Sequence, residues 1–252
     1  MLQVTFVHHS CFVVETDHAV LIFDYFPACE IHGFSFHGHL PVMDETKTWY
    51  IFASHSHQDH FSPEVLLLAK KHPQTRMHFI FSRDIHIRRT FFQEAGLSPS
   101  VKDQIRYVTP RGEYRIGDIR VETLRSTDEG VAFVVEADGL CIYHAGDLHL
   151  WSWGGRGSSY IELMTNSYQK EIAHLKNRAF DLAFVVLDPR LMDGSFSGLE
   201  YFLTHVQADL VFPMHLWQDW SLIPEAKKRP AIVPYRDHIV DIDRENLIFQ
   251  IS

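Results

Sequence analysis

The residues best suited to chemistry lie in a short stretch, which reads Ser-His-Ser-His-Gln-Asp-His over residues 54–60. An apolar run over residues 49–53 precedes it and a helix-start pattern over 62–64 follows it, so the stretch is predicted to be the loop that ends a buried strand. Residues two apart on an extended backbone point the same way, so His55 and His57 can reach one cation together. Asp59 and His60 can then face a second cation. Four ligand-type residues at this spacing favour a metal site over a polar surface loop.

The pattern His-x-His-x-Asp-His after a strand resembles the signature of the metallo-β-lactamase superfamily. The resemblance implies an α+β fold, a four-layer αββα sandwich with one or two metals at one edge of the paired sheets. It also implies a bridging carboxylate and a further histidine from the second half of the chain.

Two later segments match those implied positions. The strand predicted over residues 141–143 leads through Ala-Gly to Asp147, and the small residues let the backbone approach closely there. Asp147 resembles the family's bridging aspartate, and His215, after an apolar strand over 210–214, resembles its last histidine. The alternative for Asp147 is a turn residue, and His215 taken alone is equally well interpreted as a structural histidine. The implied metal ligands are His55, His57, Asp59, His60, Asp147 and His215, with Asp59, His60 and Asp147 as the catalytic set.

The sequence departs from the family pattern at one place. The segment over residues 123–131 follows a predicted strand, where the family carries a third histidine for the first metal, and it contains none. Three explanations stay open. An oxygen ligand substitutes, from Ser126, Thr127 or Asp128. A histidine from elsewhere reaches the site, with His144, His149 and His9 as candidates. Otherwise the first site is vacant or transient, and the second site holds its metal through Asp59, His60, Asp147 and His215.

Other residues carry weaker predictions. His9 lies in a Val-His-His-Ser segment similar to an N-terminal Gly-His-Ser/Ala segment in a subgroup that resembles the ascorbate-phosphate lactonases. It is predicted either near the metals or as a core histidine. Asp24 and Asp188 each end a strand and could orient a metal-bound histidine or cap a turn. His149 and Trp151 could form the aromatic wall of a pocket or pack in the ordinary way.

The resemblance implies one metallo-β-lactamase-like domain over residues 1–252, and the length and element order fit two sheet-plus-helix halves of about 1–115 and 116–252. No low-complexity linker divides the chain. Each half has strand patterns followed by helix patterns, which two stacked sheets with helices outside would satisfy. The expected strands cover 3–7, 11–15, 19–23, 78–81, 105–108, 113–116, 119–124, 131–136, 141–143, 180–187, 210–214 and 247–251. The expected helices cover 63–71 and 84–95, with a longer one within 159–177 and a short one from 197.

Composition narrows the function classes. The net charge of −9 argues against a sequence-independent nucleic-acid binder, while 18 histidines favour metal chemistry or proton transfer. Three cysteines without a CxxC pair favour a reducing compartment. No secretory leader or membrane span is evident, so a soluble cytoplasmic protein is expected. The expected partner is a small-molecule substrate, without nucleic acid or membrane, and homo-oligomer formation is left open.

The predicted activity is that of a metal-dependent hydrolase. Imidazole and carboxylate ligands suit one or two divalent ions per chain, with Zn²⁺ first and Mn²⁺ or Fe as alternatives. A metal pair lowers the pKa of a bound water from about 15.7 towards roughly 7, which makes hydroxide available. The expected substrate is an ester, lactone or phosphodiester of a small anionic metabolite. The alternative is a catalytically weakened metal-binding protein that acts as a sensor or partner, which the missing histidine favours and the retained Asp59, Asp147 and His215 oppose.

Overall fold

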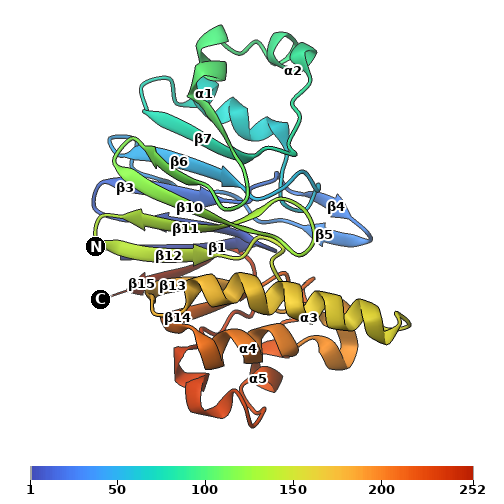
Figure 1. The fold of residues 1–252 in the computed structure, drawn as a ribbon. Helices are drawn as coiled ribbons and strands as arrows, with labels where there is room; N and C mark the ends of the chain where they lie inside the picture. Colours follow the sequence, from blue (N-terminus) through green and yellow to red (C-terminus); the bar gives the residue numbers. More distant parts are fainter. Residues whose placement is uncertain (1, 252) are drawn as a thin grey trace.

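The computed structural model describes residues 2–251 as two β-sheets stacked face to face with helices outside (Figure 1). The first sheet has the strand order β15-β1-β2-β3-β6-β7-β8, and the second has the order β14-β13-β12-β11-β10-β9. The first sheet contains β1 (Leu2–His8), β2 (Cys11–Glu15), β3 (Ala19–Phe23), β6 (Thr48–Ala53), β7 (Met77–Ser82), β8 (Ile105–Val108) and β15 (Leu247–Ile251). The second contains β9 (Glu113–Ile116), β10 (Ile119–Arg125), β11 (Val131–Ala137), β12 (Leu140–His144), β13 (Ala179–Val186) and β14 (Gln207–Met214).

Helices cover the outer face of each sheet, which completes the predicted four-layer αββα sandwich (Figure 1). The elements over the first sheet are η1 (Pro63–Leu67), α1 (Leu68–Lys71), α2 (Arg89–Glu94) and η2 (Pro99–Gln104), where η marks a 3-10 helix. Those over the second are α3 (Ser158–Ile172), η3 (Ala173–Leu175), η4 (Pro189–Gly194), α4 (Ser197–His205), α5 (Leu222–Ala226) and η5 (Val233–His238). The loop after β3 contains a small hairpin of β4 (Cys29–Ile31) and β5 (Phe34–Phe36).

Aromatic side chains join the two sheets. Phe12 of the first sheet lies 4.3 Å from Phe184 of the second, measured between ring centroids, and Phe52 meets Phe133 at 5.2 Å. All five residues of β3 are buried, because the second sheet covers one face of the strand and helices cover the other. This explains why the strand reads as a continuous apolar run rather than an alternating one.

The direction of the parallel strands decides where the predicted ligands gather. In the first sheet β3, β6, β7 and β8 run parallel, and in the second β12, β13 and β14 do. Asp24, His55, Asp147, Asp188 and His215 each lie one to three residues beyond the carboxyl end of such a strand. Carboxyl ends of parallel strands share one edge of a sheet, which is where open α/β sheets bind ligands. The loops after these strands therefore meet at one edge of the sandwich.

Two details differ from the sequence-based expectations. The helix expected over residues 84–95 forms only at Arg89–Glu94, because the Asp84 carboxylate instead accepts a hydrogen bond from the Ser56 backbone N–H at 2.8 Å. The expected division between residues 115 and 116 falls within β9, which belongs to the second sheet, and the last strand, β15, pairs with β1 of the first. Both chain ends therefore contribute to one sheet.

Gly130 tests how tightly the two sheets meet beside the predicted site. Its φ is +70°, and a Cβ there would collide with the carbonyl oxygen of Ser54, which accepts a hydrogen bond from Val131 N–H at 3.0 Å. Gly139 has a similar φ of +81° but open space around it. We expect Gly139→Ala to cost about 1–2 kcal/mol of unfolding free energy, the ordinary cost of left-handed backbone. Gly130→Ala should cost about 1–3 kcal/mol more through overpacking.

Urea denaturation of the two variants measures this difference directly. If both variants lost the same unfolding free energy, the contact between residue 130 and Ser54 would adjust to the added Cβ without destabilising the protein.

Candidate metal centre

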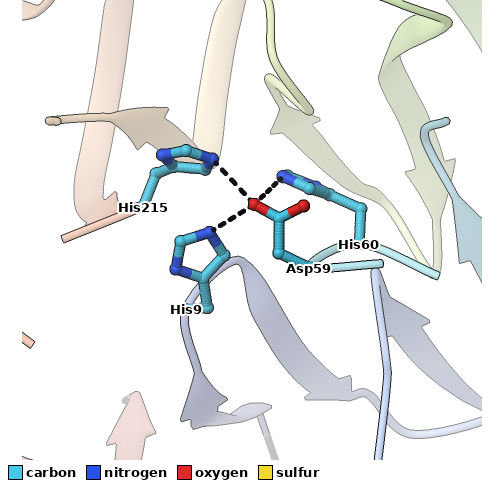
Figure 2. Close-up of side chains that lie close together, drawn as sticks. All are labelled: His9, Asp59, His60 and His215. Atoms are coloured by element: carbon cyan, nitrogen blue, oxygen red, sulfur yellow. Dashed lines mark ion pairs between the residues drawn. The ribbon is translucent and has the colours of Figure 1, made fainter. Parts of the chain in front are cut away.

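Four residues from three separate parts of the chain converge at the site edge (Figure 2). The Asp59 Oδ2 atom lies 3.3 Å from His9 Nε2, 3.6 Å from His215 Nε2 and 3.9 Å from His60 Nε2. His9 comes from the turn between β1 and β2, and its carbonyl accepts a hydrogen bond from the His215 backbone N–H at 3.1 Å. His9 and His215 both have a positive φ, +48° and +66°. Such strained backbone is typical of functional sites.

Asp147 connects this cluster to a second one. Its Oδ1 atom lies 3.2 Å from His60 Nε2 and 3.4 Å from His215 Nε2, while its Oδ2 atom lies 3.5 Å from His55 Nε2. One carboxylate thus faces imidazoles on both sides. The structure therefore places Asp147 between the two predicted positions, in the place that a bridging ligand requires.

The second cluster, around His55 and His57, has fewer buried ligands. His55 Nε2 lies 3.0 Å from His57 Nδ1, and His57 is the one exposed histidine of the motif. Asp128 stands opposite, with Oδ2 3.8 Å from His57 Nδ1, and forms a candidate cation-binding group with His57 and Asp147. Glu129, which the sequence did not single out, lies 3.6 Å from His57 Nε2. Oxygen donors thus occupy the region where a third imidazole was missing.

The other proposed substitutes do not point into this cluster. The Thr127 hydroxyl donates to the backbone carbonyl of His149 at 2.5 Å, and the Ser126 hydroxyl accepts from Asp128 N–H at 3.1 Å. His144 bonds the Ser10 carbonyl through Nε2 at 2.9 Å and Gly146 N–H through Nδ1 at 3.2 Å. Thr127, Ser126 and His144 are therefore structural, and their prediction as ligands was wrong because nearby backbone groups use their polar atoms.

Two of the remaining candidates for the third ligand do not join His55 and His57. His9 joins the cluster of Asp59, His60 and His215, so it does not complete the pair of His55 and His57. His149 is fully buried and packs against Trp151 and Tyr168 with ring centroids 5.1 and 6.2 Å apart. It therefore lies behind the site, whereas Trp151 does line the cavity.

Buried carboxylates orient the two central imidazoles. Asp24 Oδ2 lies 2.8 Å from His60 Nδ1, and Asp24 also accepts two 2.7 Å hydrogen bonds from the backbone N–H and hydroxyl of Ser54. Asp188 Oδ2 lies 2.9 Å from His215 Nδ1. Each carboxylate holds the Nδ1 side of its ring, so Nε2 is directed into the cluster. This is the arrangement that metal-binding histidines ordinarily show.

Burial and neighbouring charges give the imidazoles of the site different protonation states. Burial lowers the pKa of His9 to about 3 and that of His55 to about 4, so both rings are neutral at pH 7. His60 is also buried, but the carboxylates of Asp147, Asp59 and Asp24 outweigh the desolvation and raise its pKa well above the usual value. Asp147 would be raised by burial, yet His60, His215 and His55 hold the pKa of that carboxyl well below its usual range. The metal-free cluster therefore keeps a proton on His60.

Buried polar atoms without a hydrogen-bond partner show whether a cation would fit this cluster. His9 Nε2, His60 Nε2, His215 Nε2 and Asp147 Oδ1 are all buried, and none has a hydrogen-bond partner among residues 2–251. Leaving one such atom unsatisfied costs about 1–3 kcal/mol. Nitrogen and carboxylate oxygen atoms that face one another in this way are the donors that a divalent transition metal takes. The residues present therefore fit a bound metal ion.

An open cavity of about 300 Å³ gives access to the cluster. Trp151 and Trp153 stack on each other along one wall, with ring centroids 5.7 Å apart and planes 6° from parallel. Sequence reasoning did not assign His32, Gln58 or Arg190 to the site, since none of them stands at a ligand position of the family pattern. Arg190 carried one usable signal, its place two residues beyond Asp188. The lining residues are His32, His57, Gln58, Asp59, Asp128, Asp147, Trp151, Trp153, Arg190 and His215.

The fold and the site together define a metal-binding αββα sandwich. A family model described as the beta-lactamase superfamily domain matches residues 3–152. Since that match covers more than half of the chain, the protein belongs to the metallo-β-lactamase superfamily. The match does not single out the lactonase-like subgroup that the first residues resembled. No curated protein matches this chain.

Solved structures share the fold at low sequence identity. The metallo hydrolase Igni18 from Ignicoccus hospitalis has a TM-score of 0.58 and 14% identity, covering 100% of this chain and 99% of its own. A possible metal-dependent hydrolase from Veillonella parvula has a TM-score of 0.57 and 11% identity, covering 100% of both chains. The diiron β-hydroxylase CmlA from Streptomyces venezuelae has a TM-score of 0.55 and 13% identity, covering 86% of this chain and 45% of its own.

Metal binding should release a proton. His60 is protonated at pH 7 in the metal-free protein, and a metal can take its Nε2 lone pair only after that proton leaves. We expect about one proton released per chain, and an apparent affinity that rises with pH until the pKa of His60 is passed. Calorimetric titration with Zn²⁺ in two buffers of different ionisation enthalpy measures the release. Binding heats that do not depend on the buffer would contradict this protonation state.

The two clusters should differ in affinity. His9→Ala removes a neutral imidazole from the richer cluster and should weaken the tighter binding step by at least about 10-fold, as loss of a metal-supporting group typically does. His57→Ala should leave the tighter step unchanged and weaken the looser one. Metal titrations of the two variants serve as controls for each other. If both substitutions had the same effect on the two binding steps, the two clusters would bind metal with equal affinity.

Proposed function

We propose that this protein is a metal-dependent hydrolase that acts on an ester, lactone or phosphodiester of a small anionic metabolite. The observation that carries the proposal is the convergence of buried, unpartnered imidazole and carboxylate atoms at the base of an open cavity. A binding site that only stored metal would not need this access for a second molecule. The named hydrolases with the same fold agree with the proposal.

The donor set suits two divalent ions per chain, with Zn²⁺ as the first choice and Mn²⁺ or Fe as alternatives. His9, Asp59, His60 and His215 would hold one ion, and His55, His57 and Asp128 the other, with Asp147 between them. When bound, such a pair supplies a hydroxide at neutral pH and polarises the attacked oxygen.

The chain's own residues supply the rest of the chemistry. Asp24 and Asp188 keep His60 and His215 in one orientation, so no rearrangement is needed on binding. Asp59 lines the cavity, and although burial alone would raise its pKa, the surrounding histidines lower it, so the carboxylate is ionised at neutral pH. We assign to its carboxylate the transfer of the proton to the leaving group.

The cavity limits the substrate to a small molecule, since about 300 Å³ lies at the lower end of ligand pockets. The net charge of −9 opposes a nucleic-acid substrate, and we propose a cytoplasmic location from the three unpaired cysteines. Among the described residues, no helix has the length and apolar character needed to cross a membrane. The alternative of a weakened metal-binding sensor is less well supported, because the cavity still reaches Asp59, Asp147 and His215.

Replacing Asp147 tests the hydrolase proposal. Asp147→Ala removes the carboxylate shared by both clusters, so kcat/KM should fall by more than the roughly 10–100-fold typical of outer partners of a metal site. The assay follows hydrolysis of bis(4-nitrophenyl) phosphate and of a simple lactone by protein loaded with Zn²⁺ or Mn²⁺, with bound metal measured in parallel. Asp103→Ala, at an exposed position, is the control. A fully metal-loaded wild-type protein that hydrolyses neither substrate would support the sensor alternative.

A further inference from the structure

Arg190 is a cation in the cavity that the metal chemistry does not use. It is the one arginine among the cavity-lining residues, and its side chain is 39% exposed. It lies in η4, two residues beyond Asp188. Since the rest of that wall is made of Trp151 and Trp153, a positive charge held there needs a physical explanation.

One edge of the guanidinium is committed to Asp188. Arg190 Nε donates to both carboxylate oxygens at 3.0 Å, Nη2 donates to Oδ2 at 2.6 Å, and the Arg190 backbone N–H donates to Oδ1 at 2.8 Å. Asp188 is fully buried, so the pair is rigidly anchored. Nη1 is different, because no group within residues 2–251 accepts a hydrogen bond from it. The free end of the guanidinium still has donors to offer.

Two indole rings fix the guanidinium between them. The Arg190 Cζ atom lies 4.5 Å from the ring centroid of Trp217 and 5.4 Å from that of Trp153. Each such contact attracts the guanidinium to the ring face at a partly exposed site. Because Asp188 and the two rings already restrict the side chain, little further entropy is lost when a ligand binds to it. Arg190 is thus a preorganised donor on the cavity wall.

We propose that Arg190 receives an anionic oxygen group of the substrate, a carboxylate or a phosphate, while an adjoining flat or apolar part lies against Trp153. The proposal rests on the hydrolase proposal, since it assigns the substrate's second anchor in the same cavity. The bond to be cleaved would lie toward Asp147 and His215, which line that cavity too. Only the outer end of the guanidinium is free, so the contact is end-on rather than a two-pronged fork.

A series of three hydrolysis-resistant anilides tests this proposal by binding alone. The acyl chain ends in a methyl group, a carboxylate or a phosphonate, and calorimetry measures affinity for the metal-loaded protein. At least one anionic compound should bind 10-fold or more tightly than the neutral one to wild-type protein. The better of the two anions identifies the source as carboxylate or phosphate.

Substitutions locate the effect. Arg190→Gln should reduce the preference for the anion to less than 2-fold and leave binding of the neutral anilide unchanged, while Arg190→Lys should keep part of the preference. Arg156→Gln is the matched control, because Arg156 is exposed and also lies over an aromatic ring, Tyr160, at 5.5 Å, but does not line the cavity. Equal affinity for all three anilides in wild-type protein would overturn the proposal.

The metal content of the Arg190→Gln variant shows whether Arg190 recognises the anion or only helps to hold His215 in place. If Arg190→Gln weakened all three compounds equally and lost metal, Arg190 would act only through Asp188 and His215, and the proposal would be wrong. The matching 4-nitrophenyl esters then report on hydrolysis separately. Anion-selective binding without turnover would refute the hydrolase proposal and leave the assignment of Arg190 intact.

Discussion

The buried carboxylate of Asp147 is the group on which the rest of the site depends. It lies within 3.5 Å of imidazole nitrogens from His55, His60 and His215, which come from both sheets. A buried charge is stable only when opposite charge or donors surround it. Here the second sheet supplies the carboxylate and the first sheet supplies two of the imidazoles, so the site forms only when the two sheets stack. Gly146, with φ +51°, lies against Ser54 and forms the turn that leads to Asp147.

The two clusters around Asp147 are unequal for a physical reason. His60 and His215 are each held by a fully buried carboxylate, and His9 adds a third imidazole from a strained turn. The pair of His55 and His57 shares its further imidazole, because His60 groups with His55 and Asp147 and also belongs to the cluster of His9 and His215. Asp128 and Glu129 stand beside the exposed ring of His57. Oxygen ligands at an exposed position favour harder and more exchangeable cations.

Much of this could be predicted from the sequence because strand ends and ligand types are local signals. The apolar runs before His55, Asp147 and His215 indicated the strands, and parallel pairing then placed their carboxyl ends together. Which substitute ligand serves His57 was not predictable. Ser126, Thr127, Asp128 and His144 all carry donor atoms, and only the fold shows that backbone groups use three of them. The positions of His9 and Arg190 depend on packing between distant segments, which no local pattern encodes.

We propose that two metal ions would share Asp147, with the better-held ion on the side of His9. A crystal structure of the metal-loaded protein, with anomalous data at the zinc edge, tests this proposal. We expect the stronger anomalous peak beside His60 Nε2 and His215 Nε2, and a weaker peak beside His55 and His57. A stronger peak beside His55 and His57, or no peak at Asp147, would contradict it.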